Sequence, residues 1–470
     1  MTCVAFWKIY DKFGEDGLLG FTFLIALFLL YAYYRLCRVV SGKTVSIAFT
    51  ILFGLIACPF FVTTRPQILS CFFFILEVLL LEIFARTNNW RRLLPIPLIS
   101  VVLININAAL WPMLLILFLP FIVASFLNKK IGFESFPLKP IILCAISSFV
   151  CGFLNPYGFD AMSFAFRSYD SNVHDFIVEL KPMTITTSYG MIFFILLFLL
   201  IFIEVRNRMP LQYILLSAGT ALMSLFAARN MFIFLCLGTF PIAYVCKNIE
   251  PLNRKGLSPG ILFLFSLVGC AVVIWKIDEM QHLPVLPCVY LTFAWISFCC
   301  YFFFYSENGK RFDMKRLLLR LKFSSFLFVV LISMAFMFFY NETHHSAEKM
   351  KPLIDYLYET ENPQRVRLWT GYDTGGYVGF RGLKYNIDGR PEVFLPVNTK
   401  EENIVGDYLS LIKGELEYKQ YFAEHNFTHV ITCVNDLWLH SVLPYDNNFQ
   451  LLYEIKNSPM EYRLYKVVGK

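Results

Sequence analysis

The sequence predicts an α-helical membrane protein of about twelve spans, followed by a small α/β domain. Three observations predict this class. The chain is 57% hydrophobic and only 16% charged, whereas soluble domains carry about a quarter charged residues. Apolar runs such as 18–34 and 191–203 contain no charge and, with their flanks, are long enough to cross a hydrocarbon core about 30 Å thick. After residue 341 the composition becomes polar.

The apolar runs place the spans at about 17–37, 44–63, 67–85, 93–107, 109–127, 140–155, 189–205, 210–227, 230–246, 258–276, 283–305 and 323–341. Only 105–112, with its Asn and Pro residues, separates the short fourth span from the fifth. A pair of half-helices that dip into the membrane therefore remains an alternative there. Before the first span, residues 1–16 mix Trp7 with charged side chains and predict an amphipathic segment on the membrane surface.

The basic residues predict the orientation of the chain. Lys and Arg are concentrated in every second connector, at 35–43, 86–92, 129–139, 206–208, 247–255 and 310–322. Because basic connectors face the cytoplasm, we expect a multi-pass plasma-membrane protein with both termini outside. The predicted organisation is an external segment 1–16, a transmembrane domain 17–341 and an external domain 342–470. The basic residues behind the net charge of +7 thus set the membrane topology. They do not indicate a nucleic-acid partner.

The thirteen cysteines predict neither a disulfide framework nor a metal site. Most lie in or beside apolar runs, where cysteine packs as a small apolar side chain. Only Cys433 lies in the C-terminal domain, so that domain has no internal disulfide. No spacing matches a zinc site.

Arginines at the predicted outer surface are the first candidate functional residues. Arg65 and Arg229 lie at the outer ends of spans, and Arg167 lies in the external loop 155–188. All three are on the side that is poor in basic residues, and a guanidinium group suits phosphate oxygens. We expect them to bind a donor phosphate. Packing against lipid headgroups is the alternative for Arg65 and Arg229.

The same external loop carries the candidate catalytic residues. Glu179, Asp175 and His174 follow a turn that opens at 155–158. Carboxylates above a membrane cavity could act as a general base or hold a divalent cation. A solvated loop without chemistry is the alternative. The sequence does not define the ligands of a metal.

In the C-terminal domain, helical and strand patterns alternate. Helices are predicted at 347–358, 401–413 and 415–425, strands at 365–369, 385–387 and 428–433, and a closing pair of strands at 449–455 and 463–468. This order is typical of a small α/β domain. The glycine-rich stretch 371–377 matches no nucleotide-binding motif. We expect a turn held by a local ion pair at 386–392.

Several short motifs, in order along the chain, resemble bacterial membrane proteins of the GT-C glycosyltransferase superfamily. They are Thr-Arg-Pro-Gln at 64–67, Asn-Ile-Asn-Ala at 105–108, Asn-Pro-Tyr-Gly at 155–158, Ile-Val-Glu at 177–179, Arg-Asn at 229–230, Gly-Gly-Tyr at 375–377 and Asp-Gly-Arg at 388–390. The resemblance implies a GT-C-like fold and sugar transfer from a polyprenyl-phosphate carrier at the external face. It also implies that Asn105 and Asn107 line the cavity.

The chain departs from that pattern in two places. Asn107 stands where such proteins often have His, and the expected first span with its carboxylate-bearing loop is absent before residue 17. We therefore expect a transferase-like protein that is catalytically incomplete as this chain. A shortened gene model, a non-catalytic relative and one part of a two-chain enzyme, with a partner chain, are the three alternatives. Its other partners are a polyprenyl-phosphate-linked sugar and membrane lipids, and a divalent metal ion is the one cofactor left open. The alternatives are a lipid or glycan transporter and a non-catalytic envelope-assembly protein.

Overall fold

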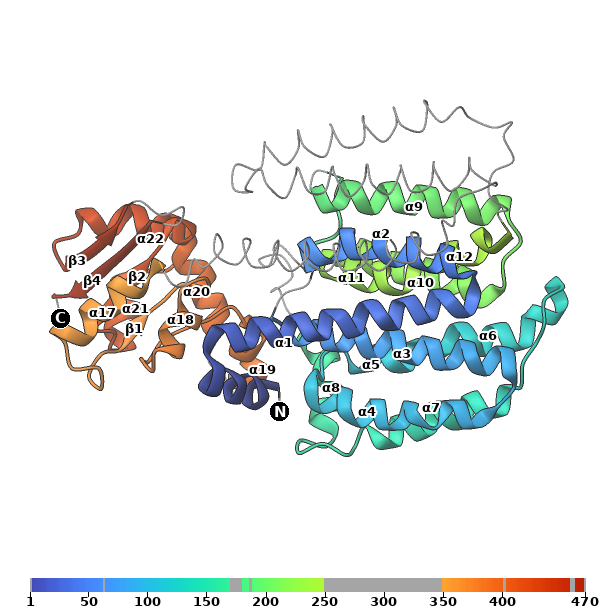
Figure 1. The fold of residues 1–470 in the computed structure, drawn as a ribbon. Helices are drawn as coiled ribbons and strands as arrows, with labels where there is room; N and C mark the ends of the chain where they lie inside the picture. Colours follow the sequence, from blue (N-terminus) through green and yellow to red (C-terminus); the bar gives the residue numbers. More distant parts are fainter. Residues whose placement is uncertain are drawn as a thin grey trace, which may run out of the picture. The chain divides into compact units, whose positions relative to one another are not determined.

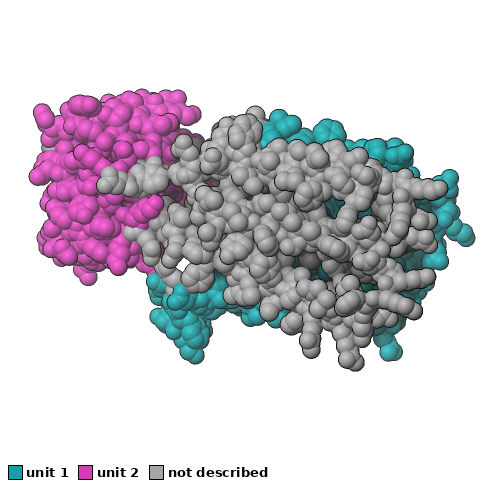
Figure 2. All heavy atoms as spheres, turned by 45° about the horizontal axis from the view of Figure 1, so that its top comes forward, with its two compact units in different colours: residues 1–166, 177–341 teal, residues 167–176, 342–470 magenta. Residues whose placement is uncertain are grey.

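The computed structural model describes residues 2–61, 64–169, 180–185, 188–248, 349–399, 403–456 and 461–468. The chain divides into two compact units (Figure 2), residues 1–166 with 177–341 and residues 167–176 with 342–470. The first unit is a bundle of apolar helices and the second a small mixed α/β unit (Figure 1).

Helices of the first unit lie at the predicted spans from 17–37 to 230–246. They are α1 (Thr2–Val40), α2 (Lys43–Phe61), α3 (Pro66–Thr87), α4 (Pro95–Ile106), α5 (Trp111–Ile116), α6 (Phe118–Leu127), α7 (Leu138–Cys151), α9 (Ser188–Arg206), α10 (Leu211–Phe226), α11 (Met231–Ile233) and α12 (Pro241–Val245). Four helical stretches are long and apolar enough to cross a membrane among the described residues, namely Asp16–Val40, Pro66–Thr87, Trp111–Ile131 and Ala228–Val245. The predicted spans 258–276, 283–305 and 323–341 lie outside the described residues.

Helix α1 contains a sharp break at Gly14. This residue has φ 65° and ψ −157°, a conformation that glycine adopts without steric cost. Beyond the break the ring of Phe6 lies 5.8 Å from the ring of Phe21, edge to face. Residues 2–13 are therefore a helix that folds back against the start of the first span (Figure 1).

Helices α4 and α5–α6 each run from one end of the bundle to the other. At one end the Asn107 side chain donates to the Ser70 hydroxyl at 3.1 Å. At the other end the Asn128 amide donates to the Gln212 side chain at 2.9 Å. Between them the Trp111 indole donates to the Ser100 hydroxyl at 2.8 Å. These contacts join α4 and α5–α6 to each other and to α3 and α10.

A tight contact holds α10 against the chain that follows it. Residues Phe234–Gly238 form a π-helix, and the Ser217 hydroxyl donates to the Gly238 carbonyl at 2.9 Å. A Cβ atom at Gly238 would lie 2.6 Å from the Thr220 hydroxyl oxygen. Small residues thus allow the two backbones to approach closely, as is common between membrane helices.

At the end of the bundle that carries the basic connectors, an ionic network binds one carboxylate oxygen of the buried Glu82. The Arg86 side chain donates to the Glu82 carboxylate at 2.8 Å and to the Tyr213 hydroxyl at 3.1 Å. The Tyr213 hydroxyl donates in turn to the same carboxylate oxygen. Glu82 and Tyr213 are each only 1% exposed, so this network joins α3 to α10 in the interior.

The second unit is built on a four-stranded sheet in the order β1-β2-β4-β3. Its strands are β1 (Leu368–Trp369), β2 (His429–Thr432), β3 (Phe449–Ile455) and β4 (Tyr462–Val467). Strands β1 and β2 are parallel, and β4 pairs antiparallel with both β2 and β3. The helices are α17 (Lys351–Thr360), α18 (Gly375–Phe380), α19 (Pro396–Thr399), α20 (Ile404–Lys413), α21 (Tyr418–Glu424) and α22 (Leu437–Val442). The predicted closing pair of strands is confirmed.

The strand predicted at 385–387 is wrong. Only Lys384 pairs with the sheet, as an isolated bridge to Arg367. The carbonyl of Ile387 accepts instead from the Thr370 hydroxyl at 3.0 Å, and a Cβ atom at Gly375 would lie 1.7 Å from that carbonyl oxygen. The Thr370 hydroxyl and the close approach of Gly375 thus take the place of backbone pairing with a neighbouring strand. The residue pattern at 385–387 does not show these distant contacts.

The predicted turn at 386–392 is held by a local ion pair. The Arg390 guanidinium donates to the Asp388 carboxylate at 2.5 Å, and the Arg390 backbone N–H donates to the same carboxylate at 2.9 Å. The Tyr385 hydroxyl adds a third donor at 2.9 Å. Asp388 is 2% exposed. These donors, the Arg390 guanidinium foremost, outweigh its burial and lower the pKa of Asp388.

Candidate functional site

One end of the bundle collects the motifs that the sequence singles out. We call it the arginine end and define it by Thr22, Thr64, Gln67, Asn107 and Arg229. The Thr22 hydroxyl donates to the Thr64 hydroxyl at 3.0 Å. The Gln67 side-chain amide donates to the Arg229 carbonyl at 3.1 Å. Segments far apart in the sequence therefore meet at this end.

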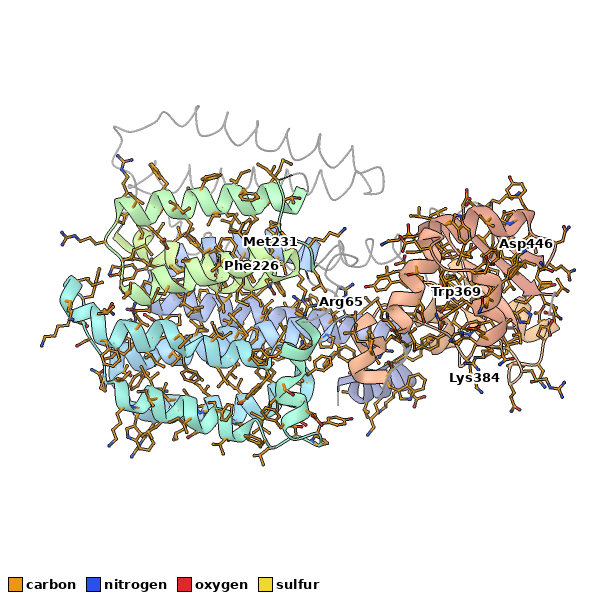
Figure 3. The ribbon with its side chains drawn as sticks, turned by 180° about the vertical axis from the view of Figure 1, so that it is seen from behind. Arg65, Phe226, Met231, Trp369, Lys384 and Asp446 are labelled. Atoms are coloured by element: carbon orange, nitrogen blue, oxygen red, sulfur yellow. The ribbon has the colours of Figure 1, made fainter. Side chains whose placement is uncertain are left out.

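Arg65 lies immediately before α3, in an extended conformation with φ −127° and ψ 150°. Pro66 favours this extended geometry at the residue before it and is tolerated at the first position of a helix. The side chain of Arg65 is exposed. Figure 3 labels it at the same end of the first unit as Phe226 and Met231, the residues on either side of the Arg229 turn.

Arg229 is half-buried in the short 3₁₀ turn η5 (Ala228–Asn230), between α10 and α11. Its neighbour Asn230 is 4% exposed and donates to the Met223 carbonyl at 3.0 Å. Because Gln67 also holds the Arg229 carbonyl, the backbone of this turn is fixed from two sides. The structure thus brings the predicted phosphate-binding segments around Arg65 and Arg229 together.

The chain that returns from the 155–188 loop pairs with the same turn. The Met183 backbone N–H donates to the Leu225 carbonyl at 3.2 Å, and the Ala228 N–H donates to the Lys181 carbonyl at 3.0 Å. Ala227 is extended, with φ −148° and ψ 121°, which allows this strand-like pairing. The segment that follows Glu179 in the sequence is therefore anchored beside Arg229.

The predicted catalytic residues Glu179, Asp175 and His174 lie outside the described residues. Arg167 lies in α8 (Phe159–Tyr169), the helix that follows the turn at 155–158. Within the described part of the chain, no group of three or more His, Cys, Asp or Glu residues could hold a metal ion. The proposed roles of these four residues and of a metal remain predictions.

The asparagines of the fourth span make structural hydrogen bonds. The Asn105 amide donates to the carbonyls of Val101 and Leu154, each at 2.9 Å. The Asn107 amide donates to the hydroxyl of Ser70. These bonds join the end of α4 to α3 and to the turn after α7. The predicted role of both residues in a cavity stays a prediction.

The turn that opens the external loop is organised by Asn155. Its side-chain amide donates to the carbonyls of Gly152 and Gly158 at 2.7 and 3.0 Å. Its side-chain oxygen accepts from the Tyr157 N–H at 2.8 Å. Gly158 has φ 54°, which favours glycine at that position. The motif at 155–158 therefore has a structural role: it forms the turn between α7 and α8.

In the second unit, the loops after the parallel strands β1 and β2 meet around Asp436. Its carboxylate accepts from the Tyr408 hydroxyl at 3.1 Å and from the Cys433 N–H at 2.8 Å. A Cβ atom at Gly371 would lie 2.2 Å from this carboxylate. Burial raises the pKa of Asp436 to about 6. Sequence reasoning missed this group, and the glycine at 371 is the one signal that points to it.

Comparison with known proteins gives a likeness of fold. No protein-family model matches the chain, and no curated protein matches it by sequence. Among solved structures, the chain is similar to the crystal structure of ArnT from Cupriavidus metallidurans bound to undecaprenyl phosphate, with a TM-score of 0.54 and 11% identity. The match covers 97% of this chain and 85% of ArnT. The chain thus shares the fold of ArnT.

Proposed function

We propose that the chain is a membrane glycosyltransferase-like protein that acts on a polyprenyl-phosphate-linked sugar at the external membrane face. Its products would be modified glycans or lipids of the cell envelope. The observation that carries this proposal is the ArnT-like fold together with the meeting of the Arg65 and Arg229 segments at one end of the bundle. The solved ArnT structure is one with undecaprenyl phosphate bound.

In the proposed mechanism, Arg65 and Arg229 bind the phosphate of the lipid carrier. As the bond from the sugar to this phosphate breaks, negative charge develops on the phosphate oxygens. Guanidinium groups held in place before the reaction stabilise that charge without further reorganisation. The bond from Gln67 to the Arg229 carbonyl supports this role because it fixes the turn that carries Arg229. The expected role of Arg167 in phosphate binding stays a prediction from the sequence.

A carboxylate would activate the hydroxyl group of the acceptor. Glu179 is the first candidate, because it precedes by two residues Lys181, whose carbonyl is bonded beside Arg229. Asp175 and His174 precede it in the same loop. General base catalysis of this kind contributes a factor of roughly 10²–10⁴ in rate. A divalent cation bound in this loop would serve the same hydroxyl.

The alternatives are a lipid or glycan transporter and an envelope-assembly protein without chemistry. Transporters often place ionisable groups near the middle of the membrane. Glu82 is the buried acid for which the structure supplies partners, and its bonds to Arg86 and Tyr213 form a structural network. Glu77 of α3 is also buried, and neither of its carboxylate oxygens has a hydrogen-bond partner among the described residues, which would suit a transporter. The ArnT-like fold and the meeting of the Arg65 and Arg229 segments favour the transferase, which is the function we propose.

The experiment is a transfer assay on the full chain reconstituted in vesicles. The donors are polyprenyl-phosphate pentoses and hexoses, and an envelope lipid extract supplies acceptors. We expect little or no transfer by the chain alone and transfer once a partner chain is supplied. Transfer by the chain alone that Glu179→Gln or Asp175→Asn reduces by at least 10²-fold would instead place the catalysis in the loop 155–188. A parallel assay with EDTA tests whether transfer requires a divalent cation. Movement of the intact donor across the vesicle membrane without release of polyprenyl phosphate would support the transporter instead.

A further inference from the structure

A surface groove near the basic end of the first unit is separate from the arginine end. It lies between the short 3₁₀ turn η1 (Trp90–Leu93) with the start of α4 on one side and the start of α7 on the other. Its volume is about 280 Å³. We call it the Trp90 groove, and its lining residues are Trp90, Leu93, Leu94, Pro97, Lys139, Pro140, Leu143, Cys144 and Ser147.

Local sequence explains why a groove forms here. Asn88 ends α3 in a left-handed conformation, and the side chain of Asn89 then accepts from the Arg91 N–H at 3.1 Å. This caps the turn η1, which precedes α4. At the base of the groove the Cys144 thiol donates to the Leu93 carbonyl at 3.5 Å and joins the two walls.

The walls of the groove leave large apolar side chains at the surface. Trp90 is 55% exposed, Leu94 is 59% exposed and Leu143 is 54% exposed. Tryptophan is enriched where a membrane protein meets the headgroup region of the bilayer. An apolar surface of this kind at the end of a span fits a hydrocarbon chain.

One basic residue lines the groove, and two more lie in the turn beside it. Lys139 lines it and is exposed to solvent, and Arg91 and Arg92 are exposed in the same turn as Trp90. None of the lining residues is acidic. Basic groups between membrane helices attract anionic lipid headgroups, by about fivefold in affinity for each Lys or Arg near the surface.

We propose that the Trp90 groove binds an anionic glycerophospholipid, with one acyl chain against Trp90, Leu94 and Leu143 and the phosphate group at Lys139. Arg91 and Arg92 add to the attraction for the headgroup. The proposal does not depend on the proposed transferase function, because it concerns the opposite end of the bundle. The charge of these basic residues, more than the apolar walls of the groove, distinguishes this site from general contact with lipid.

The test is lipid titration of the purified full chain in detergent micelles, with bound lipids counted by native mass spectrometry. The probes are dioleoyl phosphatidylglycerol and dioleoyl phosphatidylcholine, which share their acyl chains and differ in net charge. Lys139→Ala removes the central charge, and Leu143→Trp fills the groove. Lys129→Ala is the matched control, because Lys129 is exposed in the neighbouring turn η2 (Asn128–Ile131) and does not line the groove.

We expect the unmodified chain to prefer phosphatidylglycerol by at least about fivefold. The Lys139→Ala variant should bind phosphatidylglycerol about fivefold more weakly and phosphatidylcholine as before. The Leu143→Trp variant should bind both lipids more weakly, and the Lys129→Ala variant should bind both as the unmodified chain does. Equal binding of the two lipids, or equal effects of Lys139→Ala and Lys129→Ala, would overturn the proposal. Thermal unfolding of each variant in the same micelles verifies that it is folded.

Discussion

The side-chain amide of Gln67 donates a hydrogen bond to the backbone carbonyl of Arg229 at 3.1 Å, across 162 residues of sequence. Gln67 lies in the first turn of α3, two residues after Arg65, and Arg229 lies in the turn between α10 and α11. The bond therefore sets the separation of two backbone segments that each carry an arginine. It gives a physical reason for a glutamine at this place in the motif.

Replacing Gln67 with Met should loosen the Arg229 turn. Methionine has nearly the same length and no donor, so the Arg229 carbonyl loses its partner at a cost of about 1 kcal/mol. Amide hydrogen exchange in residues 225–231 should accelerate by about fivefold. Gln212→Met, at the other end of the bundle, is the control and should leave these amides unchanged. Equal exchange in the Gln67→Met variant and the unmodified chain would show that the bond does not hold the turn.

Tyr213→Phe should destabilise the first unit. The change removes the hydroxyl that donates to the buried Glu82 carboxylate and accepts from Arg86. A charged group left without one of its donors costs about 1–3 kcal/mol. We expect a lower thermal unfolding midpoint in detergent. Tyr31→Phe is the matched control, because Tyr31 is 56% exposed and its hydroxyl accepts from the exposed Arg35. Similar midpoints for the two variants would contradict this account.

Two adjacent glycines at the start of α18 should respond differently to alanine. A Cβ atom at Gly375 would lie 1.7 Å from the Ile387 carbonyl oxygen, whereas one at Gly376 would meet nothing within 4 Å. We expect Gly375→Ala to destabilise the second unit by about 1–3 kcal/mol. Gly376→Ala should be neutral or slightly stabilising.

Thiol labelling of Cys433 in urea measures this difference in the full chain. Cys433 is buried and is the one cysteine of residues 342–470, so labelling requires unfolding of the second unit. Equal urea midpoints for Gly375→Ala and Gly376→Ala would refute the close contact.

Asp436 should make the second unit less stable as pH rises from about 4 to 6. Burial raises its pKa from 3.8 in the unfolded chain to about 6 in the folded state. Between these values the folded state keeps a proton that the unfolded state has released. The stabilisation is therefore complete below about pH 4 and is lost as pH approaches 6. Its full size is about 3 kcal/mol, from about 1.4 kcal/mol for each pKa unit.

The effect of Asp436 is isolated by comparison with Asp436→Asn. Burial lowers the pKa of His429 and His440, which destabilises the folded unit as pH falls below about 6.5. Both proteins share that contribution, so it cancels in the difference of their free energies of unfolding. The difference should change by about 3 kcal/mol between pH 4 and 6.5 and stay flat above that, as followed by Cys433 labelling with a pyridyl disulfide. A flat difference throughout would mean that Asp436 titrates normally.

The sequence predicts the periodic parts of this fold well and its tertiary contacts poorly. Apolar runs locate the helices from α1 to α12, and alternation locates β3 and β4, because burial of one face imposes a pattern on the residues themselves. The strand at 385–387 fails because a Thr370 hydroxyl, distant in sequence, takes the Ile387 carbonyl. The hydrogen bond between Gln67 and Arg229 could not be predicted either, because the sequence does not show which group a glutamine side chain will bond. The roles of Glu179, Asp175 and His174 remain predictions from the sequence.

Binding of undecaprenyl phosphate tests the central claim most directly. The full chain in detergent is titrated with undecaprenyl phosphate and, as a control, with undecaprenol, which lacks the phosphate. We expect Arg65→Lys and Arg229→Lys each to weaken binding of the phosphate form by about tenfold or more, since a lysine cannot make the bidentate contact of a guanidinium group. Arg208→Lys, in an exposed basic connector, should bind as the unmodified chain does. Equal binding of the two lipids, or no effect of either arginine substitution, would contradict the claim that the arginine end holds a lipid-linked phosphate.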